Sequence, residues 1–79
     1  QLAPFFPDFP ANPTEIRFIG QPIDYIAFNG SSQGTITDIS FIEIKTGSSS
    51  LSAVEKTLKD TIEQGKVKYV EYRVDFNNK

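Results

Sequence analysis

Two apolar runs and the turn between them decide the fold: Pro22-Ile-Asp-Tyr-Ile-Ala-Phe28, then Asn29-Gly-Ser-Ser-Gln-Gly34, then Ile36-Thr-Asp-Ile-Ser-Phe-Ile-Glu-Ile-Lys45. Isoleucine, tyrosine and phenylalanine dominate both runs, and such residues fit the pleated surface of a strand. The separator is rich in glycine, serine and asparagine, which supply turn chemistry. The stretch therefore predicts a β-hairpin.

The hairpin also has a preferred register. A turn centred on Gln33-Gly34 places Asp24 opposite Glu43, with Ile26 opposite Phe41. Apolar residues then meet apolar residues at nearly every rung on both faces, as expected for inner strands. A slip by one residue would exchange the two faces, whereas a bulge or a shift by two residues stays compatible with the pattern.

This register places two carboxylates side by side in an otherwise apolar sheet, with Cα atoms about 4.5–5.5 Å apart. Two such anions repel and lose hydration unless a positive charge lies between them. Lys45 follows Glu43 by two residues, hence on the same face and about 7 Å along the strand. Asp24 and Glu43 could chelate a divalent cation, while Lys45 orients the attacking water and offsets transition-state charge. The spacing favours metal-assisted phosphodiester hydrolysis.

The plainer alternative is that Glu43 and Lys45 form a solvated ion pair on an edge strand, since Glu-x-Lys is common in strands. The apolar character of residues 39–44 argues against an edge position. Asp24 is embedded in an apolar run in the same way.

The remaining elements follow from capping and periodicity. A short strand is expected at Glu15–Ile19. Ser52-Ala-Val-Glu55 is a capping box that begins a helix, which should end before Gly65. The helix should carry two i,i+4 ion pairs, Glu55–Lys59 and Lys56–Asp60. Residues 66–76 alternate apolar and polar side chains and predict a final strand, so the order is β-β-β-α-β with a mixed sheet, an α/β (α+β) fold.

The N-terminal residues 1–14 differ in composition from residues 15–79. They contain four prolines and three phenylalanines, which predicts an extended arm before the folded domain. Phe5, Phe6 and Phe9 are expected to pack on the domain or on a partner. Because the predicted chain supplies one helix for a sheet with two faces, we expect this arm or a second copy, in a homodimer, to cover the other face.

Composition narrows the function further. The 79 residues contain no cysteine and no histidine, which excludes disulfides, thiolate or imidazole metal sites and a serine–histidine relay. A metal would need oxygen ligands, which favours magnesium, manganese or calcium. The net charge of −2 weighs mildly against a nucleic-acid partner, although carboxylates reserved for a metal account for part of it.

No apolar run approaches the ~20 residues that span a bilayer, and no signal-peptide pattern is present. We therefore expect a cytoplasmic location and no membrane contact within this chain. Because the sequence begins at Gln1 and contains no methionine, we also expect it to be a fragment of a longer protein.

Several of these patterns occur together in a known order. Pro22-Ile-Asp24, Glu43-Ile-Lys45, Thr46-Gly47, a serine run and a capped helix are similar to the pattern of the PD-(D/E)xK nuclease superfamily. With Arg17-Phe-Ile-Gly20 and Gly65-Lys-Val67 added, residues 15–75 resemble the family of endonucleases related to archaeal Holliday junction resolvases.

The resemblance implies a minimal restriction-endonuclease-like core and cleavage of DNA, with branched DNA and Holliday junctions as candidate substrates. It implies Mg²⁺ or Mn²⁺ as cofactor, held by Asp24, Glu43 and the carbonyl of Ile44. It also implies Lys45 as the catalytic lysine. The superfamily core begins with a helix that carries a further acid, and this helix is absent here. It could precede Gln1 or come from a partner subunit, and Glu15 or Asp8 could replace its acid.

Three further residues are weaker candidates for DNA contact. Arg17 could bind a phosphate, with a salt bridge to Glu15 or Glu71 as the alternative. Lys56 could follow the DNA backbone, with a solvated helix face as the alternative. Ser48 lies in the serine run that should border the site.

Two rival functions keep the same fold. The first is a catalytically silent nuclease-fold domain that serves binding or assembly, favoured by the missing helix and the negative charge. The second is a structural or oligomerisation module in which Glu43 and Lys45 are an ion pair.

Overall fold

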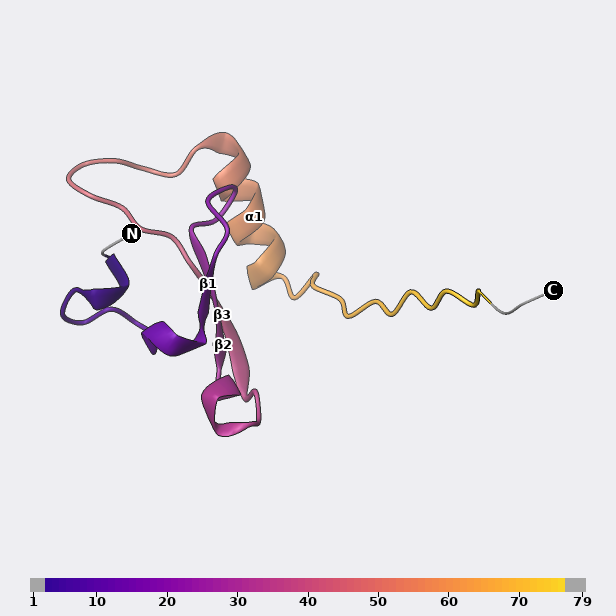
Figure 1. Cartoon of the computed structure of the whole chain (residues 1–79). Coiled ribbons are helices and arrows are strands. Elements are labelled where there is room, and N and C mark those ends of the chain that lie inside the picture. Colours follow the sequence, from indigo (N-terminus) through magenta and orange to yellow (C-terminus); the bar gives the residue numbers. More distant parts are fainter. Residues whose placement is uncertain (1–2, 77–79) are drawn as a thin grey trace.

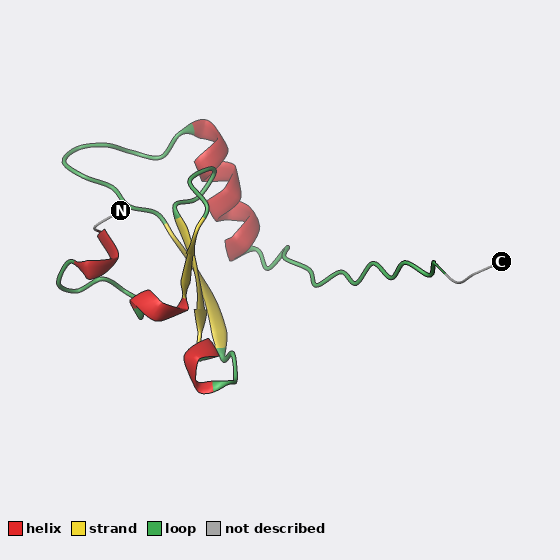
Figure 2. Ribbon diagram, viewed as in Figure 1, coloured by secondary structure: helices red, strands yellow, loops and turns green. Residues whose placement is uncertain are grey.

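The computed structural model describes residues 3–76 and shows a three-stranded antiparallel sheet with one helix (Figures 1 and 2). The strands lie in the spatial order β1-β2-β3. Residues 1–2 and 77–79, at the ends of the expected arm and domain, lie outside the described part. The elements are β1 (Ile16–Phe18), β2 (Tyr25–Asn29), β3 (Asp38–Ile42), α1 (Ala53–Glu63), and single 3-10 turns η1 (Ala3–Phe5), η2 (Pro13–Glu15) and η3 (Ser31–Gln33). The predicted β-β-β-α order is confirmed.

The hairpin has the predicted register. Tyr25 faces Ile42, Ile26 faces Phe41, and Phe28 faces Ile39. Because directly opposed residues share a face, this pairing sorts the sheet into two apolar faces. One face carries Tyr25, Ala27 and Ile42, and the other carries Ile26, Phe28, Ile39 and Phe41.

The core lies on the first of these faces. Tyr25, Ala27 and Ile42 are buried there. Phe9 from the N-terminal segment packs edge-on against Tyr25, with ring centroids 6.0 Å apart. The expectation that the arm covers this face is met by Phe9, whereas Phe5 and Phe6 are exposed.

Helix α1 covers the opposite face, and both of its ends are closed by local hydrogen bonds. The Ser52 hydroxyl accepts from the Glu55 amide at 3.2 Å, and the Glu55 carboxylate accepts from the Ser52 amide at 2.9 Å. At the other end Gly65 adopts φ 71°, and the amide of Lys66 donates to the carbonyl of Thr61. This paired closure is a Schellman motif, so the predicted helix limits are confirmed.

The two i,i+4 pairs expected on α1 are not those that the structure contains. Lys59 pairs with Glu63 at 3.1 Å, and Glu55 pairs with Lys45 outside the helix. Neither a Glu55–Lys59 nor a Lys56–Asp60 ion pair occurs among residues 3–76. A charged side chain on a helix has several partners within reach. Glu55 pairs with Lys45, whose ammonium is partly shielded from water, instead of with Lys59.

The predicted final strand does not pair in this structure. Residues 66–76 leave α1 as an extended segment that points away from the sheet (Figure 1). The sheet within residues 3–76 is therefore wholly antiparallel rather than mixed. Alternating side chains suit a strand, but a strand exists only where an edge supplies its hydrogen bonds, and the Schellman motif directs this segment away from β3.

The hairpin loop depends on one glycine more than on the other. Gly30 and Gly34 have φ 96° and 87°, values that favour glycine. A Cβ on Gly30 would lie 2.1 Å from the carbonyl oxygen of Thr35, whereas a Cβ on Gly34 would meet no atom within 4 Å. Gly30 therefore carries both a backbone and a packing requirement.

This contrast predicts two different stability losses. Gly34→Ala should lower the free energy of unfolding by about 1–2 kcal/mol through backbone strain alone. Gly30→Ala should lower it by about 3 kcal/mol or more, because the Thr35 carbonyl must also move. Urea unfolding of the two variants measures the difference, and equal losses would show that the loop opens freely at Gly30.

Candidate functional site

Asp24 and Glu43 lie at the same end of the hairpin. Asp24 immediately precedes β2, and its carbonyl accepts from the amide of Ile19 at 2.8 Å. Its Oδ2 accepts from the amide of Ile44 at 2.8 Å, across to the segment that continues β3. Glu43 immediately follows β3 and is half-buried. The hairpin thus brings both carboxylates to one end of the sheet, and Asp24 is fixed to the segment opposite.

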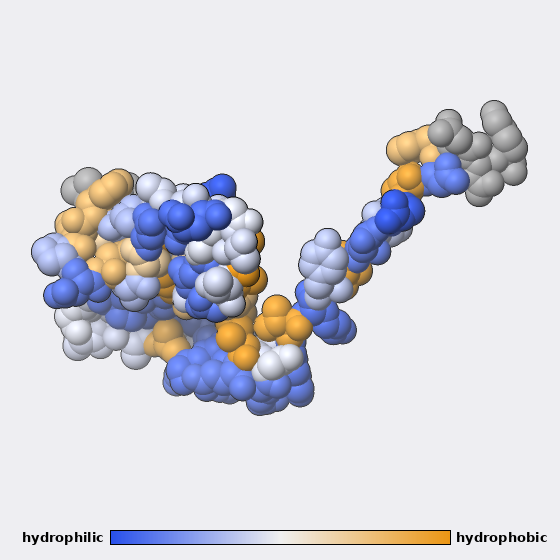
Figure 3. All heavy atoms as spheres, turned by 90° about the horizontal axis from the view of Figure 1, so that it is seen from below, coloured by the Kyte–Doolittle hydropathy of each residue, from blue (hydrophilic) through white to orange (hydrophobic). Residues whose placement is uncertain are grey.

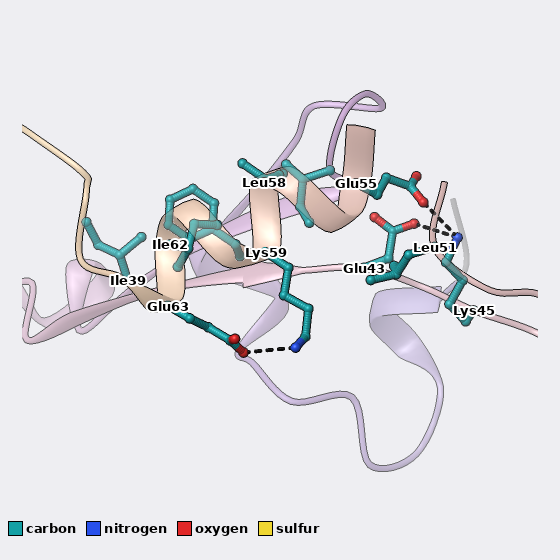
Figure 4. A pocket seen from close by; sticks show the side chains of 11 residues that line it. Ile39, Glu43, Lys45, Leu51, Glu55, Leu58, Lys59, Ile62 and Glu63 are labelled. Carbon is teal, nitrogen blue, oxygen red and sulfur yellow. Dashed lines mark hydrogen bonds and ion pairs between the residues drawn. The ribbon is translucent and has the colours of Figure 1, made fainter. Parts of the chain in front are cut away.

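Lys45 joins this pair to the helix. Its Nζ lies 3.2 Å from Glu43 Oε2 and 3.2 Å from Glu55 Oε1. Figure 4 shows the three side chains pointing toward one another, Glu55 from α1 and the other two from the segment that continues β3. Of the predicted group, Glu43 and Lys45 are in contact, and Glu55 is added to them. Asp24 contacts the amide of Ile44 and acts on Glu43 by charge repulsion.

The electrostatics of this group favour an added cation. Burial raises the pKa of Glu43, and the hydrogen bond from Lys45 only partly opposes that rise, while Asp24 and Glu55 add to it by charge repulsion. The pKa of Lys45 is raised mainly by its hydrogen bond to Glu55. The carboxylates thus outnumber the single ammonium between them, and Glu43 retains an unmet preference for positive charge.

Glu55 is the functional candidate that the sequence did not single out. Its pKa is lowered chiefly by the amide of Ser52 and then by Lys45, so it remains a carboxylate that can hold the ammonium. In sequence it is the last residue of a capping box, at helix position N3, which is a sufficient structural role. The only local signal for a second role was its position at the start of a helix that follows Glu43-x-Lys45 closely.

A groove of about 380 Å³ extends from this charged group between α1 and the sheet. Lys45, Glu43 and Glu55 lie at one end of it, and Ile39, Ile62 and Glu63 at the other (Figure 4). Its walls are mainly apolar; they include Ile39 and Phe41 of β3 and Leu58 of α1. No residue of α1 is buried, so the helix lies over the sheet without filling the space beneath it.

The weaker candidates lie apart from the cluster. Arg17 is exposed on β1 opposite Ile26, which places it on the α1 face of the sheet. Its Nη1 donates to the carbonyl of Ile16 at 2.9 Å, and it forms neither of the salt bridges considered above. Lys56 is exposed on α1, and Ser48 is exposed in the turn after Thr46.

Glu15 does not serve as a replacement acid at the site. It is buried, and its Oε2 accepts from the hydroxyl of Ser32 at 2.6 Å and from the amide of Ser32 at 3.0 Å. These bonds lower the pKa of Glu15 and fix it to η3, at the tip of the hairpin opposite from Asp24. Its function is to anchor the hairpin loop. Asp8 is exposed in the N-terminal segment.

The oxygen-only donors of this end of the sheet fit a hard cation such as Mg²⁺ or Mn²⁺. Asp24 and Glu43 are two carboxylates in adjacent positions, with too little positive charge between them. Among residues 3–76 no three acidic side chains converge closely enough to form a complete metal cluster. Other ligand positions would therefore fall to a backbone carbonyl such as that of Ile44, to water and to the substrate.

Comparison with known proteins supplies one match. The family model described as endonuclease related to archaeal Holliday junction resolvase matches residues 1–74. Searches of curated proteins and of solved structures return no significant match. Among the residues that the structure describes, no helix is both long and apolar enough to cross a membrane.

The raised pKa of Glu43 predicts a pH-dependent stability effect. A carboxyl whose pKa rises on folding destabilises the folded state when ionised. Glu43→Gln should therefore raise stability above the folded pKa of Glu43, and the gain should disappear below its ordinary pKa of 4.5. Urea unfolding well above and well below that pH tests this.

The matched control is Glu63→Gln, whose side chain is exposed on α1. It should change stability little at either pH. If Glu43→Gln instead destabilised the protein at neutral pH, the ion pair with Lys45 would outweigh the cost of burying Glu43.

Proposed function

Because the chain belongs to the family of endonucleases related to archaeal Holliday junction resolvases, we propose that it cleaves DNA phosphodiester bonds with Mg²⁺ or Mn²⁺. The proposal places the site at Asp24, Glu43 and Lys45, in the arrangement of a PD-(D/E)xK nuclease. Branched DNA, including Holliday junctions, is the proposed substrate class.

One observation carries the proposal. Glu43 contacts Lys45 and lies across from Asp24, where β2 begins and β3 ends, although burial of the ionised Glu43 costs free energy. A fold under no functional constraint would gain stability by replacing Glu43 with a neutral residue. Two carboxylates and a lysine at one end of the sheet are the arrangement expected for metal-assisted hydrolysis.

The structure suggests a distinct role for each side chain. The amide of Ile44 fixes the Asp24 carboxylate, so this side chain is held in place before any ligand binds. Glu43 and Asp24 would hold the metal, which supplies Lewis acidity and lowers the pKa of bound water. Lys45 would orient the attacking water and offset the negative charge that develops on the phosphate.

Glu55 acts here as a positioning residue. Its carboxylate, itself fixed by the amide of Ser52, holds the Lys45 ammonium at 3.2 Å. Binding of a cation by Glu43 would compete with the Lys45–Glu43 ion pair, and Glu55 would then keep Lys45 beside the site. Lys45 would thereby stay available to water and phosphate.

DNA would approach from the α1 face of the sheet. Arg17 on β1 and Lys56 on α1 are exposed cations, and Ser48 lies in the exposed turn between β3 and α1. We propose that these residues contact phosphates rather than bases, because backbone contacts position a nuclease without reading sequence.

The second candidate function is a catalytically silent domain of the same fold. It is favoured by one observation: Lys45 is already paired with both Glu43 and Glu55, which is the arrangement of a structural ion-pair network. Such a domain would bind DNA or a partner without cleaving it.

Activity assays separate the two candidates. Wild-type protein should nick plasmid or branched DNA in Mn²⁺, less in Mg²⁺, and not in Ca²⁺ or chelator. Lys45→Ala should lower the cleavage rate about 100-fold or more while Mn²⁺ binding persists, because lysine acts on water and charge. Asp24→Asn should lose both DNA cleavage and Mn²⁺ binding, since an amide supplies no anionic oxygen.

Calorimetric titration measures the affinity of each variant for Mn²⁺. Lys59→Ala is the control, because Lys59 pairs with Glu63 at the far end of the groove and should affect neither quantity. If wild-type protein cut no DNA in Mn²⁺ and matched Lys45→Ala in every assay, the silent domain would be the correct function.

Binding to DNA gives an independent prediction. Arg17→Ala and Lys56→Ala should each weaken binding to all DNA sequences alike. Each should also reduce the slope of log affinity against log salt by about 0.9, the value for one phosphate contact. A slope unchanged in both variants would place the DNA on another surface.

A further inference from the structure

The tip of the hairpin contains an asparagine followed directly by a glycine. Asn29 is the last residue of β2, and Gly30 begins the loop that leads to β3. The side-chain amide of an asparagine is open to attack by the backbone nitrogen of the next residue, and glycine has no Cβ to hinder that attack. Asn12, the other asparagine of residues 3–76, precedes a proline, whose nitrogen carries no proton to lose. Within this range Asn29–Gly30 is therefore the step most open to deamidation.

The closed tip restrains the side chain of Asn29. Its Nδ2 donates to Asp38 Oδ2 at 2.9 Å and to Ser40 Oγ at 3.1 Å, which engages both protons of the amide. The carbonyl of Asn29 accepts from the amide of Thr37 at 2.8 Å and keeps the backbone in the strand. Attack by the Gly30 nitrogen would require the Asn29 side chain to turn, so the bonds to β3 must break first.

The closed tip restrains the attacking nitrogen as well. The buried Glu15 carboxylate accepts from the hydroxyl and the amide of Ser32 at 2.6 and 3.0 Å, and the backbone of Gly30 also hydrogen-bonds to it. An amide nitrogen attacks only after it loses its proton, and a neighbouring anion opposes that loss. Glu15 therefore holds Gly30 in its unreactive form.

We propose that Asn29–Gly30 is a self-modification site, which the closed hairpin tip protects and local opening of the tip exposes. In the open tip the Gly30 nitrogen loses its proton to solvent and bonds to Cγ of Asn29. The bond from Cγ to Nδ2 breaks, and ammonia leaves with the added proton. Water then opens the cyclic imide at either of its carbonyl carbons, which gives aspartate or isoaspartate. Water is the only co-reactant, and nothing is oxidised or reduced.

The tip has free access to that water. It forms the lower end of the molecule in Figure 1, and Figure 3 views the molecule from that side. Residues 31–39 are exposed, and Asn29 and Gly30 are half-buried. Segments with few buried contacts open without unfolding of the whole domain. The core residues Tyr25 and Ile42 pair at the far end of the hairpin, so the tip can open while they stay paired.

The aspartate product opposes closure by charge. A carboxylate at position 29 would face Asp38 Oδ2, where the amide now donates. Like charges directly opposite each other destabilise a strand pair. Glu15 lies at the same tip, and neither Asp38 nor Glu15 forms an ion pair within residues 3–76. No cation therefore offsets the added charge there.

The isoaspartate product opposes closure by geometry. It places one more carbon in the main chain between positions 29 and 30. The loop has no room for such a shift, because even a Cβ on Gly30 would lie 2.1 Å from the carbonyl oxygen of Thr35. Either product therefore leaves the tip open, and the modification is a one-way record of opening.

Deamidation rates test the gate without DNA or metal, so the result is independent of the nuclease proposal. The chain is held in mildly alkaline buffer, and mass spectrometry of the peptide that contains Asn29 measures the acid formed. The folded chain should react at least about tenfold more slowly than the chain unfolded in urea. Glu15→Gln and Asp38→Ala should each raise the folded-state rate about tenfold, because each removes a charged hydrogen-bond partner from the tip.

The matched control is Ile42→Val, which weakens the core at the far end of the hairpin. Urea unfolding gives the stability loss of each variant, and Ile42→Val should accelerate deamidation less than the tip variants do for the same loss. Equal acceleration for equal loss would overturn the local gate, because unfolding of the whole domain would then expose the site. A folded wild-type chain that reacts as fast as the unfolded chain would overturn the protection itself.

A second experiment tests the one-way step with a variant that carries the aspartate product. Asn29→Asp should be less stable to urea than Asn29→Ala, because it adds repulsion from Asp38 to the lost hydrogen bonds. The exchange Asn29→Asp/Asp38→Asn should recover most of the loss, because the amide at position 38 then donates to the carboxylate at position 29. Equal stability of Asn29→Asp and Asn29→Ala, with no recovery in the exchange, would overturn the one-way step.

Discussion

The pairing of β2 with β3 is the constraint on which the other features depend. It buries Tyr25, Ala27 and Ile42 on one face and leaves Ile39 and Phe41 on the other, beneath α1. Side chains in a strand alternate strictly, so a shift of one residue would exchange these faces. The same register brings Asp24 to the end of the hairpin where Glu43 lies. Core packing and site geometry are therefore specified by a single set of backbone hydrogen bonds.

The charged cluster at the end of the hairpin carries a cost in stability. Burial of Glu43 raises its pKa, and Lys45 relieves that cost only in part. Lys45 has a second partner in Glu55, which the helix cap holds in place. The bond between Glu55 and the amide of Ser52, which closes the helix, thus also helps to fix the position of Lys45. Within the described residues the cluster is an ion-pair network of Glu43, Lys45 and Glu55.

Stability of so short a chain is limited by how much apolar surface it can bury. The N-terminal segment contributes Phe9 to one face of the sheet, and the loop tip is anchored by Glu15 through Ser32. The α1 face is less complete, since the helix leaves a groove beneath it and, within residues 3–76, no strand pairs with the outer side of β3.

The sequence by itself determined the local elements. Alternating apolar residues and a glycine-rich turn predicted the hairpin and its register, because that pairing matches both faces and a slip by one residue would exchange them. Ser52, Glu55 and Gly65 specified the limits of α1, because capping is local chemistry. The family resemblance likewise rested on motifs that can be read in order along the chain. For these features the interacting groups are near in sequence or fixed by a short turn.

The tertiary structure decided which distant groups meet. Glu55 pairs with Lys45 instead of Lys59. Glu15 binds Ser32 at the hairpin tip and is not part of the site. Arg17 forms neither of the expected salt bridges and donates to the carbonyl of Ile16. The tertiary structure also left residues 66–76 outside the sheet, although their pattern is that of a strand. Each of these outcomes depends on the direction in which one element leaves another and on the competition among several partners of similar energy. Such choices are fixed by packing in three dimensions, and no local pattern records them.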